Sequence, residues 1–133
     1  MDKKVEIETL AKYRLEQSKE NLEEAEALFN INKFKGANNR AYYSIFHAIK
    51  AILALEQVDF KKHSSAIAYF NKNYISTGIF SKDLGRRINE ARFFREKSDY
   101  VDFYIVTKDE AQQQIDTAKI VIDKTEKFIK EHN

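Results

Sequence analysis

The segment 37–55 constrains the fold more than any other part of this chain. It reads ANNRAYYSIFHAIKAILAL, and apolar side chains fall on nearly every side of the helix that these residues would form. A helix that is apolar almost all round has to be surrounded by other helices, because none of its faces suits water. The sequence therefore predicts a helical bundle in which this segment is the central helix.

The segments on either side of the central helix supply two long partner helices. Residues 5–30 place apolar side chains at steps of three and four, with glutamates and lysines between them, which is typical of an amphipathic helix. The break INKFKG follows, where we expect Gly36 to form a left-handed turn before the central helix begins. Further on, Thr107 and Glu110 form a capping box that predicts the start of a last helix running to the C-terminus.

Two shorter helices are expected between the long ones. The first is predicted over residues 63–74, HSSAIAYFNKNY, and Ser81 is a suitable N-cap for the second, which continues through LGRRINEARFFRE. The aromatic and β-branched run KSDYVDFYIV, residues 97–106, predicts an extended connection packed on the bundle. The absence of proline and the presence of only three glycines also favour helices. We therefore expect an all-α fold, an up-and-down antiparallel bundle of four to five helices in one domain over residues 1–133.

The composition excludes several classes of site. The chain has no cysteine, so a disulfide, a thiolate zinc site and a cysteine nucleophile are all impossible. Its three histidines show no spacing typical of metal ligands, and it contains no glycine motif for phosphate or dinucleotide binding, so we expect neither metal nor cofactor. Because no apolar run is long enough for a signal peptide or a membrane span, we expect a cytoplasmic protein without membrane contact.

Charge is distributed unevenly along the chain. Residues 1–31 carry five basic and eight acidic groups, residues 32–98 carry thirteen and five, and residues 99–133 again carry five and eight. A basic middle third between acidic ends suits an anionic partner such as RNA or a nucleotide. It equally suits a domain in which basic middle helices pair with acidic outer helices, and the sequence alone leaves both interpretations open.

Arg40 and His47 are the first candidates for chemistry. Seven residues make nearly two helical turns, so both side chains leave the same face of the central helix, about 10 Å apart along its axis. An arginine stabilises the charge of a phosphate, and a histidine near neutral pH accepts the proton of a ribose 2′-hydroxyl. The alternative is that Arg40 pairs with an acidic residue of the first helix and that His47 is a core imidazole with a hydrogen-bond partner.

Four motifs together resemble the HEPN family of small helical domains. They are NRAYYSIFHA, KKHSSAIAYF, NYISTGIF and REKSDY, and their order matches the family over nearly the whole chain. The resemblance implies an up-and-down helical bundle, a homodimer, and a toxin-like ribonuclease whose antitoxin is a minimal nucleotidyltransferase. The implied activity is that of a metal-independent endoribonuclease on single-stranded RNA. The alternative is a non-catalytic subunit that binds nucleotide or RNA, or that docks the nucleotidyltransferase.

Catalytic members of this family carry an arginine and, after it, a histidine, with four to six residues between them. In this chain Arg95 is followed by Tyr100 where the histidine is expected, and a tyrosine is a poor general base at neutral pH. Arg40 and His47 offer a pair with the family's spacing on the central helix. The resemblance therefore makes these four residues, Arg95, Tyr100, Arg40 and His47, the catalytic candidates.

Four further residues are candidates for binding RNA or a nucleotide, namely Arg92, Asp99, His63 and Tyr43. Arg92 and Arg95 lie three apart on a helix and suit a phosphate, although pairing with nearby acidic residues fits the same spacing. His63 follows two lysines at a predicted helix start, where an anion is favoured. Tyr43 offers a ring on which a base stacks, while aromatic residues at such spacings also serve as core or dimer interface. A purely structural dimeric bundle is the third possibility.

Overall fold

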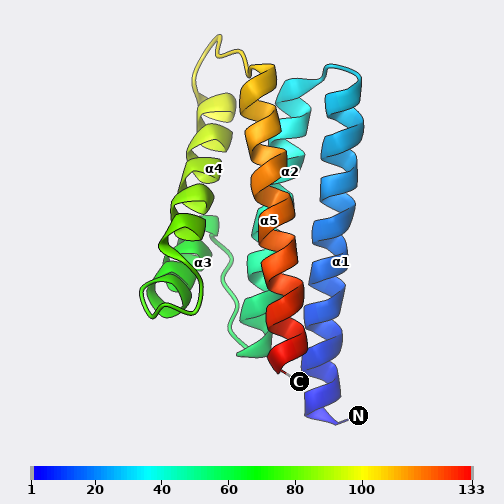
Figure 1. Cartoon of the computed structure of the whole chain (residues 1–133), viewed down its shortest axis with the longest axis vertical. Helices are drawn as coiled ribbons and strands as arrows, with labels where there is room; N and C mark the ends of the chain where they lie inside the picture. Colours follow the sequence, from blue (N-terminus) through cyan, green and yellow to red (C-terminus); the bar gives the residue numbers. More distant parts are fainter. Residues whose placement is uncertain (1, 133) are drawn as a thin grey trace.

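The computed structural model describes residues 2–132, which fold into helices joined by short connections (Figure 1). The helices are α1 (Lys3–Asn30), α2 (Phe34–Leu55), α3 (His63–Phe70), the single π-helical turn η1 (Asn71–Ile75), α4 (Lys82–Tyr100) and α5 (Lys108–His132). Within this described part of the chain there is no strand. The predicted all-α class is confirmed.

The four long helices run alternately up and down the bundle. In Figure 1, α1 rises from the N-terminus, α2 descends, α4 rises and α5 returns, so both termini lie at the same end. The short α3 packs on α2, and η1 joins it to the foot of α4. This is the predicted up-and-down antiparallel bundle, with five α-helices over residues 2–132.

Helix α2 is the centre of the bundle. It packs against α1, α3, α4 and α5, and its apolar side chains are buried along nearly its whole length. The largest of its fully buried apolar side chains are Tyr42, Ile45, Ile49, Ile52 and Leu53. A side chain of this size stabilises a fold by about 1.5–3 kcal/mol when it leaves water. The prediction of a central helix is confirmed.

The turn between α1 and α2 differs from the prediction. Asn32, with a φ of +63°, takes the left-handed conformation that the sequence predicts for Gly36. Asparagine tolerates this conformation better than most residues, because its short polar side chain bonds locally. Gly36 lies instead in the first turn of α2, where a Cβ atom would stand only 3.0 Å from Leu28 Cδ1. The glycine therefore allows α1 and α2 to approach each other closely.

Two predicted helix starts are confirmed by their hydrogen bonds. The Ser81 hydroxyl accepts from the backbone N–H of Leu84 at 3.1 Å, which caps α4. Thr107 Oγ1 accepts from the N–H of Glu110 at 3.1 Å, and the Glu110 carboxylate accepts from the N–H of Thr107 at 2.9 Å. This reciprocal pair is the capping box, and it fixes where α5 begins.

The connection between α4 and α5 is shorter than predicted. Helix α4 continues to Tyr100, so only residues 101–107 join the two helices. Ion pairs one turn apart favour the helical conformation through this last part of α4, as in the pair of Arg95 and Asp99 at 2.8 Å. Part of the connection also projects into solvent instead of packing on the bundle, since Phe103 and Ile105 are 100% and 81% exposed.

The arginines of α4 are paired within that helix. Arg86 and Arg87 pair with Asp83, Arg86 also pairs with Glu90, Arg92 pairs with Glu96, and Arg95 pairs with Asp99. Among residues 2–132, the ion pairs of these arginines do not reach the acidic helices α1 and α5. The interpretation that the basic middle of the chain neutralises the acidic outer helices is therefore wrong for α4.

Candidate functional site

Helix α2 leaves one narrow stripe of its surface partly open to solvent. Between Ala37 and Leu55 the residues that are not buried are Asn39, Arg40, Tyr43, His47 and Lys50. The last four follow one another at steps of three, four and three residues, so they lie along a single face of the helix. We call these four residues the open stripe. It presents a guanidinium, a phenol, an imidazole and an ammonium group on a segment whose other residues, apart from Asn39, are buried.

Three other helices place polar groups along the open stripe. Asn21 of α1 contacts His47, the ring of His63 in α3 lies against Tyr43, and Arg95 of α4 donates to the Tyr43 hydroxyl at 3.4 Å. In Figure 1, α1 and α4 lie on opposite sides of α2. The open stripe is therefore bordered by α1 and by the pair of α3 and α4.

The ring of Tyr43 is the point where the candidate residues meet. The guanidinium carbons of Arg40 and Arg95 lie 5.6 and 5.7 Å from its centroid. The ring centroids of His63 and His47 lie 5.5 and 6.3 Å from it. Two cations and two imidazoles thus surround one aromatic ring, although their residues are spread over three helices. This concentration of donors and positive charge suits a phosphate group.

Arg95 is held in place by an aromatic and an acidic partner. Its guanidinium also lies 5.3 Å from the centroid of the Tyr42 ring, which is a cation–π contact. Its Nε atom lies 2.8 Å from a carboxylate oxygen of Asp99, and this contact is an ion pair without the alignment of a hydrogen bond. The side chain is only 17% exposed, so few rotamers remain open to it. Arg95 is therefore a positioned cation at the border of the open stripe.

His47 is oriented through two successive hydrogen bonds. The side-chain N–H of Asn21 donates a hydrogen bond to the Glu24 carboxylate at 3.0 Å. The Asn21 Oδ1 atom therefore faces His47 and lies 2.7 Å from its Nδ1. Because an amide oxygen only accepts hydrogen bonds, Nδ1 carries the proton, and Nε2 of the neutral ring keeps a free lone pair. Burial first, and then the positive charges of Lys50 and other basic neighbours, lower the pKa of His47. His47 is therefore a neutral base at pH 7.

His63, at the start of α3, packs among aromatic rings. Its ring centroid is 3.9 Å from that of Phe46, and its Nδ1 is 3.2 Å from the hydroxyl of Tyr42. Burial lowers the pKa of His63, and the positive charges of Arg95, Lys50 and Arg92 lower it further. Burial also raises the pKa of Tyr42 to about 12, so this phenol keeps its proton.

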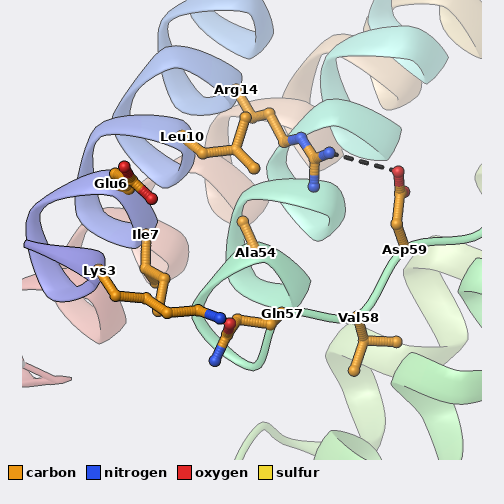
Figure 2. A pocket seen from close by; sticks show the side chains of 9 residues that line it. All are labelled: Lys3, Glu6, Ile7, Leu10, Arg14, Ala54, Gln57, Val58 and Asp59. Atoms are coloured by element: carbon orange, nitrogen blue, oxygen red, sulfur yellow. Dashed lines mark hydrogen bonds and ion pairs between the residues drawn. The ribbon is translucent and has the colours of Figure 1, made fainter. Parts of the chain in front are cut away.

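Lys50 anchors the lower end of the open stripe to the loop that follows α2. Its ammonium group pairs with Asp59, lies 3.4 Å from the Phe60 carbonyl, and stands 5.7 Å from the centroid of the Phe46 ring. Arg14 pairs with the same Asp59 at 3.5 Å, beside a hollow between α1 and the end of α2 (Figure 2). The hydrogen bond from Lys50 is the main cause that lowers the pKa of Asp59. These contacts fix the loop that leads to His63.

The structure brings five of the eight candidate residues together at Tyr43 and separates one. Arg40 forms no ion pair with α1 among the described residues, and its hydrogen bond goes to Asn39 at 3.2 Å. Arg92 and Asp99 lie at the border, where Arg92 pairs with Glu96 at 2.9 Å and Asp99 pairs with Arg95. Tyr100 lies apart, because it is 73% exposed and shares a shallow hollow on α4 with Phe93 and Val101.

Three residues of this site were missed by the sequence analysis. Lys50 continues the spacing of Arg40, Tyr43 and His47, so the period of the helix gives a signal for it. Asn21 gives no such signal, since it is one polar residue among many on α1, and only the packing of α1 on α2 places it beside His47. In the sequence, Tyr42 is one more aromatic residue of the apolar helix, yet in the fold its hydroxyl contacts His63.

Residues 2–132 lack two further features. No group of three or more histidine, aspartate or glutamate side chains is placed to hold a metal ion. No helix in this part of the chain combines the length and the apolar character that crossing a membrane requires.

Comparison with known proteins gave consistent matches. The family model described as HEPN domain matches residues 11–128. A protein of Methanocaldococcus jannaschii named "putative toxin" is 33% identical over 115 residues, which covers 86% of this chain and 78% of that protein. A second "putative toxin" of that organism is 34% identical over 117 residues, which covers 88% of this chain and 87% of that protein. A UPF0332 protein of Thermotoga maritima is 29% identical over 126 residues, which covers 95% of this chain and 96% of that protein.

We expect the stability of the protein to fall as the pH drops below about 6.5, the ordinary pKa of histidine. His47 and His63 have lowered pKa values in the folded state, so below that pH the unfolded chain binds more protons than the folded chain. The free energy of unfolding therefore rises with pH from the folded pKa values up to about 6.5 and then levels off. Urea unfolding at a series of pH values measures this dependence.

Two variants locate the origin of this pH dependence. His47→Gln should remove part of it, whereas His132→Gln, at the exposed end of α5, is the matched control and should leave it intact. A free energy of unfolding that stays constant through this pH range, or a pH dependence that is undiminished in His47→Gln, would show that His47 does not contribute as described.

Proposed function

Because the chain belongs to the HEPN family, we propose that it is a toxin-like protein that cleaves single-stranded RNA as a metal-independent endoribonuclease. The names of two relatives support the toxin-like role. The observation that carries the proposed activity is the meeting of Arg40, Arg95, His47 and His63 at the ring of Tyr43. Guanidinium groups stabilise a phosphate as its charge grows, and imidazoles transfer protons.

The proposed reaction is an internal transfer at one phosphate of the RNA. The ribose 2′-oxygen loses its proton and attacks the adjacent phosphorus, the bond to the 5′-oxygen of the next nucleotide breaks, and that oxygen gains a proton. The products are a 2′,3′-cyclic phosphate and a free 5′-hydroxyl, so the atoms and charges balance without a metal. Arg40 and Arg95 stabilise the negative charge on the phosphate oxygens during the transfer.

The surroundings of the site favour a polyanion. Lys61 and Lys62 precede His63 and are exposed, while Arg92 lies at the border on α4. Clustered positive charge attracts the backbone of a single strand and raises its rate of association. This positive charge supports the proposal that the basic middle of the chain binds an anionic partner.

A second candidate function is a non-catalytic subunit that binds nucleotide or RNA, or that docks a minimal nucleotidyltransferase. Tyr100 favours this alternative, because it occupies the position where catalytic relatives carry histidine and because it is exposed. In either function the proposed partner is a minimal nucleotidyltransferase. It acts as the antitoxin of the ribonuclease in the first case, and it is the enzyme that the subunit docks in the second.

The proposed assembly is a homodimer formed through an exposed apolar surface at the end of α4. Its residues are 49% to 100% exposed and are Phe93, Tyr100, Val101, Phe103 and Ile105. Exposed aromatic groups of this kind are enriched at protein interfaces.

Cleavage of a fluorescent single-stranded RNA in the presence of EDTA tests the activity. We expect the purified chain, free of any partner, to cleave it, and Arg95→Ala to lower the rate by about 10²–10³-fold, as for loss of one charge-stabilising donor. Arg86→Ala is the matched control, since Arg86 lies on α4 in exposed ion pairs away from Tyr43. RNA that stays intact with the wild-type chain would refute the ribonuclease, and RNA binding without cleavage would favour the second candidate.

Light scattering after gel filtration tests the assembly. We expect the wild-type chain to elute as a dimer and Phe103→Glu to elute as a monomer, because a charge replaces a fully exposed phenylalanine at the proposed interface. Tyr13→Glu is the control, since Tyr13 is 60% exposed on α1. A monomeric wild-type protein, or a dimer that survives Phe103→Glu, would overturn this interface.

A further inference from the structure

Two imidazoles lie against the same pair of aromatic rings. The ring centroid of His47 lies 6.3 Å from that of Tyr43 and 6.0 Å from that of Phe46. For His63 the same two distances are 5.5 and 3.9 Å. Both histidines are only partly buried, so each keeps access to solvent and to a ligand on the open stripe. Cleavage of RNA needs one group that takes a proton and one that gives a proton, and this site holds two groups of the right kind.

The two histidines are held by different partners. The Asn21 oxygen accepts from Nδ1–H of His47 and so holds the ring in the form whose Nε2 is a base. Nδ1 of His63 meets instead the hydroxyl of Tyr42, a side chain that is 1% exposed. A phenol that keeps its proton is both a donor and an acceptor. It therefore remains a partner for Nδ1 when His63 is neutral and when it is protonated, and in both states it leaves Nε2 of His63 free for a ligand.

We infer that His47 and His63 are the base and the acid of this site, with Asn21 and Tyr42 as the residues that position them. This inference rests on the proposed ribonuclease function and adds the division of labour between the two histidines. It also explains how the site works without a histidine at position 100.

The two histidines account for both protons that move in the cleavage step. Nε2 of His47 takes the proton of the 2′-hydroxyl while the 2′-oxygen forms its bond to phosphorus. The bond between phosphorus and the 5′-oxygen breaks, and Nε2–H of protonated His63 gives its proton to that oxygen. The lowered pKa of His63 disfavours this protonated form in the free protein, and the negative charge of the bound phosphate favours it. His47 ends protonated and His63 ends neutral, and exchange of protons with water restores both.

A substrate with sulfur at the 5′ leaving position separates the two roles. Sulfur leaves readily as a thiolate and needs no proton, whereas oxygen does need one. The experiment compares cleavage of a normal RNA with cleavage of an RNA of the same sequence that carries the 5′-bridging sulfur. The proteins are the wild-type chain, His47→Gln, His63→Gln and the control His132→Gln, each verified as folded by circular dichroism.

We expect His63→Gln to cleave the normal RNA about 10²–10⁴-fold more slowly than the wild-type chain, the usual contribution of acid or base catalysis. The same variant should cleave the sulfur substrate at nearly the wild-type rate. His47→Gln should be slow on both substrates, because the 2′-hydroxyl still has to lose its proton. Equal losses of His63→Gln on both substrates, or full activity of His47→Gln on the normal RNA, would overturn the assignment.

The outcome also separates this inference from the proposed function. A wild-type chain that cleaves neither RNA refutes the ribonuclease and the inference together. If the wild-type chain cleaves RNA and both His47→Gln and His63→Gln cleave it as fast as the wild type, the inference alone is refuted.

The positioning residues give a second test that does not depend on replacing a histidine. Tyr42→Phe keeps the buried ring and removes only the hydroxyl, so it should slow cleavage of the normal RNA more than that of the sulfur substrate. Asn21→Ala should lower the population of the Nδ1–H form of His47, which nitrogen NMR of the imidazole reports directly. Equal effects of Tyr42→Phe on both substrates, or an unchanged His47 spectrum in Asn21→Ala, would contradict these roles.

Discussion

The burial of α2 is the constraint on which the rest of the structure depends. Its apolar residues need covering on nearly all sides, and each large one contributes about 1.5–3 kcal/mol when it is covered. Helices α1, α4 and α5 and the short α3 provide that cover. What remains is the open stripe, where the sequence carries polar and charged groups in place of apolar ones. The same packing that stabilises the fold therefore decides where a ligand can reach the central helix.

The properties of the candidate site follow from its partial burial. Arg95 is held against aromatic rings, and burial shifts the pKa values of His47 and His63 downwards. Polar groups of the site are held by partners from another helix or loop, as His47 is by Asn21 and Lys50 is by Asp59. Groups with partners and with little freedom are suited to bind a phosphate and to transfer protons without rearrangement.

Much of the fold could be predicted from local signals, whereas the site required the packing. The capping residues Ser81 and Thr107 and the apolar period located the helices, because these signals act within one or two turns. The turn at Asn32 was not predicted, because packing of Gly36 against Leu28 outweighs the usual preference of glycine for turns. On α2 the seven-residue step of Arg40 and His47 indicated one face of a helix. The meeting of that face with residues of α1, α3 and α4 depends on how the helices pack, which one sequence does not specify.

The most direct test of the central claim is a titration of the histidine side chains, observed by NMR, with a single-stranded DNA oligonucleotide. Such a strand has the phosphates of RNA but lacks the 2′-hydroxyl, so it binds without being cleaved. The account predicts that the imidazole signals of His47 and His63 shift together and saturate at one bound strand, while those of His132 stay in place. Signals of His47 and His63 that remain unchanged while the strand binds would contradict it, because the ligand would then occupy a surface other than the open stripe.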